Sequence, residues 1–403
     1  MMRWRTTLWI MVGIQALSVG SFFFALPFIP FQVEELGIHD PAAVALWSGV
    51  IFSINALTGA LFAPLWGDVA DRVGRKAMVV RSSIFGGLTA AMMAFSPNVW
   101  ILTTSRALMG VAGGFTSAAT ALVGSIVPEG ELGFALGWMA TGQIVGTLLG
   151  PLVGGVVVDA THHYRSIYLL TTLGTWVSAF LCWRFVREDF ARAAPSATPR
   201  LPIWRQFAAI VRAPEMMPMF AVLVLGQVAI LATTPVIALY VRQMVGPSPL
   251  IGGYVGASFA VMGIADLLAS PFLGKRSDRI GYRRVLLISI AGAAICTIPQ
   301  AFVHDIRLFL ALRFGVGIFL GGIIPTAVAW IGRQFPAEQR GRVYGVTYSA
   351  MFFGQFVGPT FGGALAARFG VASVFIATGV AMVLNFIWVA RGVRSGESAP
   401  PRP

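Results

Sequence analysis

Twelve long apolar stretches constrain the fold of this chain more than any other feature. Each holds about 20 mostly apolar residues, the length that an α-helix needs to cross the hydrocarbon core of a bilayer. The composition agrees, since 57% of the residues are hydrophobic and only 11% are charged, whereas roughly a quarter of the residues in soluble proteins are charged. We therefore expect an all-α integral membrane protein with twelve transmembrane helices. The expected spans are residues 8–31, 46–66, 78–95, 99–123, 132–158, 166–185, 216–241, 250–273, 285–303, 306–331, 343–366 and 372–389.

The basic residues are distributed unevenly between the two sides of these spans. A formal net charge of +13 would suit a nucleic-acid partner, but 23 of the 29 lysines and arginines fall in the N-terminus, the tail and the segments after the second, sixth, eighth and tenth spans. The opposite side holds four, which are Arg165, Arg242, Arg307 and Arg368. Because basic loops stay in the cytoplasm, we expect a multi-pass protein of a plasma membrane, specifically a bacterial inner membrane. Both termini would be cytoplasmic, and nucleic acid is not an expected partner.

The sequence contains an internal repeat with an offset of about 207 residues. Three motifs recur at this offset: residues 64–76 (PLWGDVADRVGRK) as 271–284 (PFLGKRSDRIGYRR), Arg106 as Arg313, and the glycine-rich stretch 146–155 as 354–363. Six spans per copy is an even number, so the two copies share one orientation and are related by an axis along the membrane normal. We expect a six-helix bundle at 1–185, a proline-broken cytoplasmic linker at 186–214, a second six-helix bundle at 215–391 and a cytoplasmic tail at 392–403.

The repeated motifs resemble the signature motifs of a known family. The GDVADRVGRK stretch after the second span, the Arg106 and Gly110 of the fourth span and the Gly-Pro-x-x-Gly-Gly stretch of the fifth span resemble the three motifs of the major facilitator superfamily. The third is similar to the motif typical of the proton-driven exporters, and residues 27–37 are similar to the twelve-span multidrug/proton antiporters. The resemblance covers essentially the whole chain. It implies the major facilitator fold of two pseudo-symmetric bundles, and a multidrug exporter that exchanges amphipathic small molecules for protons by alternating access.

The charged hairpin after the second span is a candidate for controlling conformational change. Its glycines permit a tight turn, and its charged side chains either form a network or only fix the orientation of the protein. The resemblance implies that Asp71 and Arg75 latch the two halves together, with Asp71 facing the N-terminus of the eleventh span near Val343. Tyr282 stands in the second copy where Arg75 stands in the first, so we expect a one-sided latch.

The fifth span carries glycines at every fourth position, from Gly142 to Gly154. Such a stripe lets another helix approach closely. One interpretation is ordinary helix packing. The other, which we call the sharper hypothesis, is packing between the two halves, with the eighth span as the partner. The residues that we predict for conformational gating are Gly67, Asp71, Arg72, Gly74, Arg75, Lys76, Asp278, Arg279, Gly150, Pro151, Gly154 and Gly155.

Three charged residues, Arg106, Asp266 and Arg313, fall well inside the expected spans, where charges are costly and are usually functional. Arg106 and Arg313 either extend to the membrane surface or face the protein interior, where Arg106 could bind an anionic substrate group. Asp266 is either a structural hydrogen-bonding acid, an acid exposed to a water-filled vestibule, or a proton carrier whose burial favours the protonated form. No carboxylate lies deep in the first half. The residues that we predict for proton coupling are Asp266, Glu34, Asp159 and Arg106.

Uncharged polar and aromatic residues within the spans are candidates for contacts with the substrate. A cavity with much aromatic surface and few charges would suit bulky apolar molecules. The predicted cavity residues are Gln15, Phe28, Arg106, Gln143, Gln227, Arg313, Tyr344, Tyr348 and Gln355. No phosphate-binding pattern, metal-ligand cluster or nucleophile–base arrangement is present in the sequence, so we expect neither an enzyme nor a cofactor. The expected protein is a monomer in the lipid bilayer. The alternative is an exporter or importer of a single metabolite, such as a sugar or a lipid-like molecule.

Overall fold

The computed structural model describes residues 2–188, 217–334 and 337–392. These residues form helices joined by short turns and contain no β-strand. Eleven helical segments among them are long and apolar enough to cross a membrane. The expected eleventh span, 343–366, falls within α15 (Ala337–Phe369). The all-α membrane fold is therefore confirmed, while most of the predicted linker and nearly all of the predicted tail lie outside the described residues.

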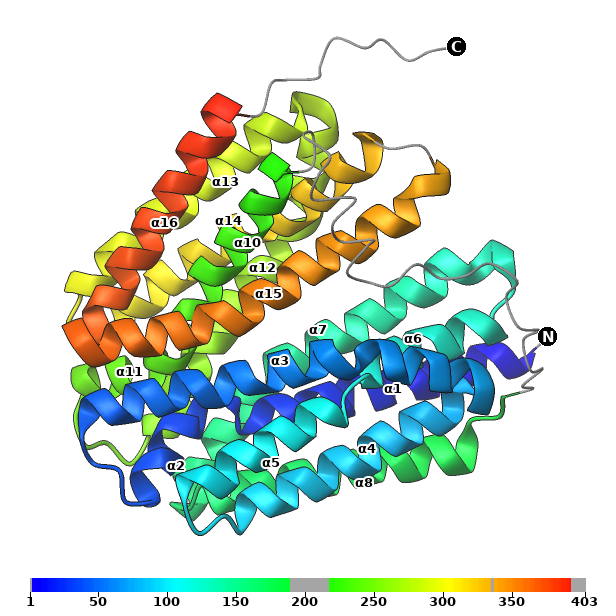
Figure 1. The fold of residues 1–403 in the computed structure, drawn as a ribbon, viewed down its shortest axis with the longest axis horizontal. Coiled ribbons are helices and arrows are strands. Elements are labelled where there is room, and N and C mark those ends of the chain that lie inside the picture. The colour runs from blue at the N-terminus through cyan, green and yellow to red at the C-terminus, as the bar shows by residue number, and fades with distance from the viewer. Residues whose placement is uncertain (1, 189–216, 335–336, 393–403) are drawn as a thin grey trace. The chain divides into compact units, whose positions relative to one another are not determined.

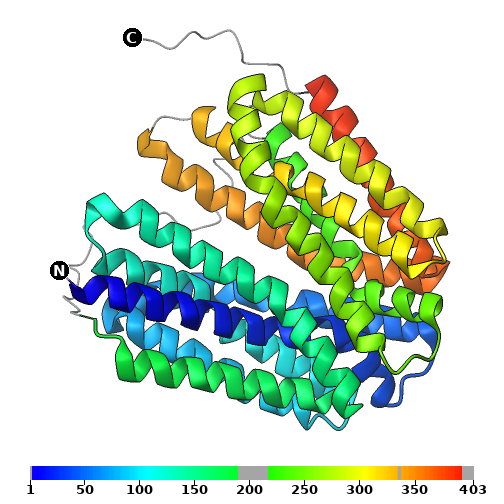
Figure 2. The same cartoon turned by 180° about the vertical axis from the view of Figure 1, so that it is seen from behind.

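The chain divides into two compact units, which Figures 1 and 2 show from opposite sides. The first unit contains residues 1–197 and 237–260, and the second contains 198–236 and 261–403. The helices of the first unit are α1 (Met2–Phe24), α2 (Ile29–Glu35), α3 (Pro41–Val73), α4 (Arg75–Ala94), α5 (Val99–Val111), α6 (Phe115–Ile126), α7 (Leu132–Thr161), α8 (Arg165–Phe185), α11 (Ile237–Val245) and the start of α12 (Ile251–Ile280). The helices of the second unit are α10 (Met217–Ala232), the rest of α12, α13 (Tyr282–Thr297), α14 (Ile306–Gln334), α15 and α16 (Val371–Gly392).

Short-range signals in the sequence set several helix boundaries. Asp40 and Asn98 precede α3 and α5, and each side chain accepts a hydrogen bond of 3.0 Å from the backbone amide three residues later. Such caps satisfy a backbone donor that has no partner inside the helix. Gly74 separates α3 from α4 with a φ of 102°, and Gly281 separates α12 from α13 with a φ of 94°. Only glycine adopts this conformation without strain, so both hairpins depend on it.

The fourth span departs from the expected single helix. It consists of α5 and α6, which are separated at Gly114, where φ is 95°. The repeat-related segment in the second half is the unbroken helix α14. The two copies of the repeat therefore differ in backbone structure, although Arg106 and Gly114 recur as Arg313 and Gly321.

The same pairs of helices pack together in both units. In the first unit α1 packs along α7, and α4 packs along α8; in the second unit α10 packs along α15, and α13 packs along α16. Figure 1 shows α4 and α8 side by side. These pairs are related by the sequence repeat, so the structure of each unit carries the internal symmetry.

Apolar side chains lie both inside and outside these units. Met11 and Leu122 are among the fully buried residues of the first core, and Ile290 and Val222 are among those of the second. Many other large apolar side chains are exposed, including Phe272 with 75% of its surface. A soluble protein rarely exposes so much apolar surface, and a lipid environment accounts for it.

Candidate functional site

A carboxylate from the first half of the sequence caps a helix of the second half. Asp159, near the end of α7, accepts hydrogen bonds of 2.7 Å from the backbone amides of Gly252 and Gly253. These amides lie in the first turn of α12, where backbone donors lack helical partners and the helix dipole favours a negative charge. The sequence singled out Asp159, but it did not predict this cap, because the two partners are more than 90 residues apart.

The helices meet closely beside this cap because glycines remove the side chains. A Cβ atom on Gly252 would collide with the backbone oxygen of Gly155 on α7, and a Cβ on Gly155 would collide with Gly252. One turn further along, a Cβ on Gly256 would lie 2.5 Å from the backbone oxygen of Pro151. The predicted pairing of the fifth and eighth spans is therefore observed in the structure, through Gly155 and Pro151.

A second carboxylate makes a similar connection between α2 and α11. Both terminal nitrogens of Arg242 donate hydrogen bonds to the two carboxylate oxygens of Glu34, the bond from Nη2 to Oε1 measuring 2.6 Å. The guanidinium also lies over the ring of Phe31, 5.1 Å from its centre. Two-pronged pairs of this kind are among the stronger charge-assisted contacts in proteins. Together with the Asp159 cap, this pair joins helices of the two sequence halves, and we call the two contacts the carboxylate contacts.

An aromatic cluster surrounds the Glu34–Arg242 pair. Tyr164 packs against the rings of Phe28 and Phe31, with centres 6.4 and 5.6 Å away. Burial above all, and then the charge of Glu35, raises the pKa of Tyr164 to about 12, so its hydroxyl is neutral at physiological pH. Phe28, which we predicted to line a substrate cavity, has 1% of its surface exposed and belongs to this cluster.

Arg106 is buried within the first unit. Its side chain is 8% exposed, so it does not extend to the membrane surface. One terminal nitrogen lies 3.2 Å from the sulfur of Met109, and Tyr168 is close enough to interact with its charge. No carboxylate among the described residues pairs with this guanidinium. A buried cation without a fixed counter-charge is suited to bind a negative group, which matches one of the roles predicted from the sequence.

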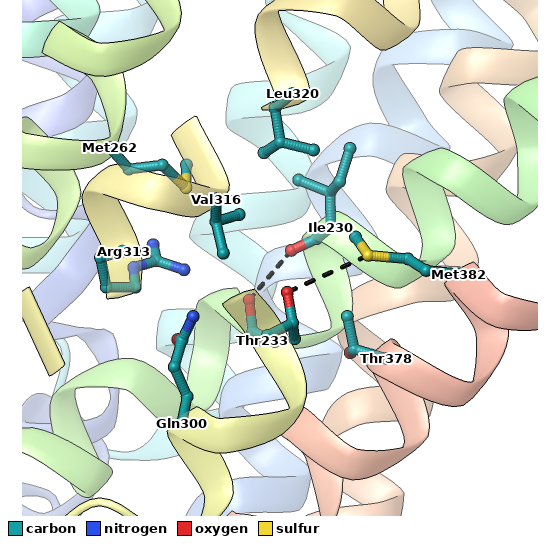
Figure 3. A pocket seen from close by; sticks show the side chains of 10 residues that line it. Ile230, Thr233, Met262, Gln300, Arg313, Val316, Leu320, Thr378 and Met382 are labelled. Carbon is teal, nitrogen blue, oxygen red and sulfur yellow. Dashed lines mark hydrogen bonds between the residues drawn. The ribbon is translucent and has the colours of Figure 1, made fainter. Parts of the chain in front are cut away.

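Arg313 is buried within the second unit and lines a small pocket. Its side chain is 3% exposed, so it also does not reach the surface. Figure 3 shows the guanidinium beside Gln300 and Thr233. The pocket has room for about one water molecule. It is therefore too small to be the cavity for a bulky substrate.

Asp266 occupies an exposed position on α12. One carboxylate oxygen accepts a hydrogen bond of 2.9 Å from the hydroxyl of Ser270, one turn later. Among the alternatives that the sequence left open, this bond fits a structural hydrogen-bonding acid, and the role of proton carrier stays a prediction.

The first repeated hairpin is fastened by a residue that the sequence analysis missed. Glu188, three residues after α8, accepts hydrogen bonds from the backbone amides of Arg75 and Lys76, at 3.0 and 2.8 Å. The Lys76 ammonium donates to the backbone oxygen of Trp183 at 2.9 Å. The sequence shows Glu188 shortly after the sixth span, and it shows a helix that begins after Gly74. Only the structure shows that Glu188 binds the start of that helix.

The second hairpin is fastened differently. Tyr282 donates a hydrogen bond from its hydroxyl to Asp278, one turn earlier, and Arg283 donates to the backbone oxygen of Ala390 at 2.6 Å. Arg72 and Arg279, the basic residues at matching positions, are both exposed. The side chains of Asp71 and of the residues around Val343 in α15 lie outside what the structure describes, so the latch between them stays a prediction.

The expectation that Gly67 belongs to a turn was wrong, because it lies inside α3 with open space around it. Arg81 lies in α4, stacks 3.4 Å from the centre of the Trp66 ring and donates to the backbone oxygen of Gly113 at 2.8 Å.

The glycine stripe of the fifth span has a different partner from the one in the sharper hypothesis. A Cβ on Gly146 would lie 2.6 Å from the backbone oxygen of Ala16, and a Cβ on Gly150 would lie 2.6 Å from the Cβ of Phe23. Gly142 and Gly154 likewise face α1. The stripe therefore packs α7 on α1 within the first half, and residues beside it, including Gly155, Pro151 and Asp159, contact α12.

The other predicted cavity residues are scattered. Gln15 is buried and donates to the hydroxyl of Thr116 at 3.5 Å, whereas Gln143 is exposed. Gln227 is buried beneath Gly354, and Gln355 is partly exposed. The side chains of Tyr344 and Tyr348 lie outside the described part. None of Gln15, Gln143, Gln227 and Gln355 lines the pocket of Arg313.

Comparison with known proteins assigns the family. The model of the major facilitator superfamily matches residues 8–265 and 250–403. The chain is 33% identical to the multidrug resistance protein MdtG of Yersinia enterocolitica over 92% of its length and 89% of that protein. It is also 33% identical to MdtG of Enterobacter lignolyticus, over 96% and 92% of the two chains. The fold and these matches define a multi-pass membrane transporter, and the chain belongs to the major facilitator superfamily.

Solved structures agree with this fold. A bacterial homologue of the human lysosomal transporter Spinster, in an inward-facing and unoccupied conformation, has a TM-score of 0.78 at 14% identity, covering 96% of each chain. The human organic anion transporter MFSD10 has a TM-score of 0.68 at 16% identity, covering 96% of this chain and all of that one. At these identities the likeness shows the fold alone.

Proposed function

We propose that this protein is a proton-coupled multidrug exporter that moves amphipathic small molecules by alternating access. Its similarity to the MdtG proteins over more than nine-tenths of its length supports this assignment. The observation that carries the mechanism is the pair of carboxylate contacts, in which Glu34 binds the last turn of α11 and Asp159 binds the first turn of α12. The alternative, a transporter of a single metabolite, shares the fold and differs in its substrate range.

The carboxylate contacts provide a physical link between protons and gating. The pair with Arg242 and the cap on α12 both require a negative carboxylate. A proton on Glu34 or Asp159 removes that charge and weakens the contact. A gate held in this way opens when protons bind and closes when they leave. We therefore assign the proton-sensing role to Glu34 and Asp159, two of the residues predicted from the sequence for proton coupling.

The remaining predicted residues take separate roles in this proposal. Arg106 would receive a negative substrate group or respond to a proton bound nearby. Asp266, exposed on α12, would be the second acid on the proton path. The hairpin residues Asp71 and Arg75 would form the latch on the opposite side of the membrane.

The proposed setting follows from the distribution of basic residues. The basic hairpins and both termini would face the cytoplasm, and the carboxylate contacts would face the outside of a bacterial inner membrane. In this orientation the proton-sensing acids meet the side from which protons enter. The protein would work as a monomer.

Transport by the purified protein in proteoliposomes with an imposed pH gradient tests the proposal. We expect uptake or release of a fluorescent amphipathic cation that follows the gradient and stops when an ionophore collapses it. Transport that ignores the gradient would contradict proton coupling. A panel of toxic compounds applied to cells that express the protein separates the two substrate ranges: increased resistance to several unrelated compounds supports multidrug export, and resistance to none favours the single-metabolite alternative.

A further inference from the structure

A group of basic residues lies at one end of the second unit, where α12 is followed by α13 and where α16 ends. Residues 271–284 and 390–392 contain a single acid, Asp278, which accepts a hydrogen bond from the hydroxyl of Tyr282. The basic residues of the same two ranges are Lys275, Arg276, Arg279, Arg283, Arg284 and Arg391. The carboxylate contacts and the proposed latch leave Arg284 and Arg391 without a role.

Arg283 holds the start of α13 and the end of α16 at the same level. Its Nη2 donates a hydrogen bond of 2.6 Å to the backbone oxygen of Ala390, and the two helices pack along each other (Figure 1). Arg284 follows Arg283 on α13, and Arg391 follows Ala390 on α16; both side chains are exposed. Two neighbouring helices therefore each carry an exposed guanidinium at the same end.

Exposed apolar side chains continue from each of these two arginines along its helix. On α13, Ile288 and Ile295 lie four and eleven residues after Arg284, and both are exposed. Residues at such spacings share one face of an α-helix. On α16, the exposed residues that precede Arg391 on one face are Val380, Leu384 and Trp388. We call the two arginines and these five apolar residues the lipid-facing surface.

The two arginines lie where the membrane-spanning part of each helix ends. The candidate spans are Tyr282–Phe302 in α13 and Val371–Arg391 in α16, so Arg284 and Arg391 belong to the terminal turns of these spans. Trp388 lies one turn before Arg391, and tryptophan is typical of the boundary between hydrocarbon and headgroups. The lipid-facing surface is therefore basic at the headgroup level and apolar below it.

This distribution is complementary to an anionic phospholipid. Such a lipid carries a negative phosphate directly above its acyl chains, and basic groups between transmembrane helices attract it. Guanidinium groups bind phosphate through paired hydrogen bonds. Because Arg284 and Arg391 stand on two adjacent helices, they suit a headgroup with two phosphates better than a headgroup with one.

The first copy of the repeat does not carry this combination of charges. The positions 207 residues before Arg284 and Arg391 hold Ala77 and the exposed Arg184. Glu188 also places a carboxylate at the start of α4. The first copy therefore has one arginine and a nearby acid where the second copy has two arginines, so the lipid-facing surface is not a general consequence of the repeated fold.

We propose that the lipid-facing surface binds a phospholipid with two phosphates, which Arg284 and Arg391 contact, while its acyl chains lie along α13 and α16. The bound lipid joins the ends of the two helices and stabilises the second unit, because a ligand that binds the folded protein shifts the unfolding equilibrium toward it. This site does not depend on the substrate, on proton coupling or on the orientation of the protein in the membrane.

Thermal unfolding of the purified full-length protein in detergent tests this site. The melting temperature is measured with added cardiolipin, which has two phosphates, and with phosphatidylglycerol, phosphatidylethanolamine or sodium phosphate at the same phosphate concentration. We expect cardiolipin to raise it by about 2 °C, with saturation, and the other three to raise it less. An equal rise with phosphatidylglycerol or phosphatidylethanolamine would overturn the preference for two phosphates. An equal rise with sodium phosphate would show binding of a free anion and overturn the lipid site.

Variants locate the cardiolipin response. Arg284→Gln and Arg391→Gln should each raise the half-saturating cardiolipin concentration by about fivefold, the effect expected for one basic residue beside an anionic lipid. Arg184→Gln removes the exposed arginine at the equivalent position of the first copy and should change this concentration little. All three side chains are exposed, so we expect the variants to fold. Equal effects of the three substitutions would show that only the total positive charge matters and would refute the site.

Discussion

The two copies of the repeat begin their second long helix in different ways. In the first copy Asp40 caps α3 from the preceding residue, through the amide of Ala43. In the second copy Pro247 stands where Asp40 would recur, and Asp159 from α7 caps α12 instead. A local cap stays in place whatever the rest of the protein does. A cap supplied by another helix, which we call a borrowed cap, is lost whenever α7 and α12 separate. The stability of the first turn of α12 therefore depends on the conformation of the protein.

The same asymmetry holds for the other carboxylate contact. The positions 207 residues after Glu34 and Asp159 are Val241 and Ala366, so the acids occur in the first copy alone. The position 207 residues before Arg242, the partner of Glu34, holds Glu35, a residue of opposite charge. Helix packing is therefore duplicated between the copies, whereas the charged contacts that join the two sequence halves are not.

The largest effect is expected where the second copy is changed to match the first. Gly252→Ala introduces the residue found at the equivalent position of α3, Ala45. Its Cβ would meet the backbone of Gly155, which cannot rotate away. We expect the α7–α12 contact to weaken by about 2 kcal/mol, the cost of overpacking a close contact. Spin labels at His162 and Leu250, both exposed, should show a longer or broader distance distribution.

Gly253→Ala is the matched control for this substitution. Its Cβ would lie 3.1 Å from the carboxylate of Asp159, a side-chain atom that can shift. We therefore expect a smaller change in the distance distribution than for Gly252→Ala. Equal distributions for Gly252→Ala and the unmodified protein would show that the close approach of the two helices is not needed for closure.

The next effect concerns the borrowed cap itself. Asp159→Asn keeps the shape of the side chain and removes its charge, as a bound proton does. Losing a charge-assisted hydrogen bond costs about 1.5 kcal/mol, which shifts the equilibrium between closed and open forms by about tenfold. The contact should then be weak at every pH, so transport in proteoliposomes should lose most of its dependence on external pH.

Asp40→Asn tests whether this response belongs to the borrowed cap. The Asp40 cap uses one carboxylate oxygen, which asparagine also provides, whereas the Asp159 cap uses both. The Asp40 cap also does not join different helices. Transport by this variant should keep its pH dependence. If Asp159→Asn also keeps it, Asp159 is a structural cap and does not sense protons.

A comparable test applies to Glu34, with a neighbouring acid as the control. Glu34→Gln removes the charge that pairs with Arg242, and Glu35→Gln removes the charge of the adjacent exposed carboxylate. We expect a shift of up to about tenfold for the first and little change for the second, measured by the same spin labels across a pH series. Equal responses would mean that the general negative charge of this region matters and the specific pair does not.

Much of the fold was predictable from the sequence because it depends on local patterns. The length of the apolar stretches predicted the spans, and Gly74 and Gly281 marked the hairpins. The break between α5 and α6 at Gly114 was not predicted, because Gly321 in the second copy lies in a continuous helix. The same residue type therefore gives two backbone structures, and tertiary packing decides between them.

The candidate site was less predictable because its contacts join distant segments. The sequence identified Glu34 and Asp159 as unusual acids, but it gave no reason to pair them with Arg242 or with the amides of α12. It missed Glu188 for the same reason. The glycine stripe of α7 was recognised correctly as a packing surface, but its partner α1 belongs to the same half, and a glycine pattern alone does not specify which helix it accommodates.

The smallest predicted effect concerns the cap on α4, beside the hairpin between α3 and α4 in the first copy of the repeat. Glu188 caps α4 through the amides of Arg75 and Lys76, so Glu188→Ala should cost about 1 kcal/mol and lower the melting temperature by about 2 °C. Glu129→Ala, which removes an exposed acid before α7, should change it less. Because Lys76 and Arg283 bind backbone oxygens at positions that also differ by 207 residues, that contact belongs to the shared fold. A loss of stability confined to Glu188→Ala would then show that the cap on α4 is a separate addition to the first copy.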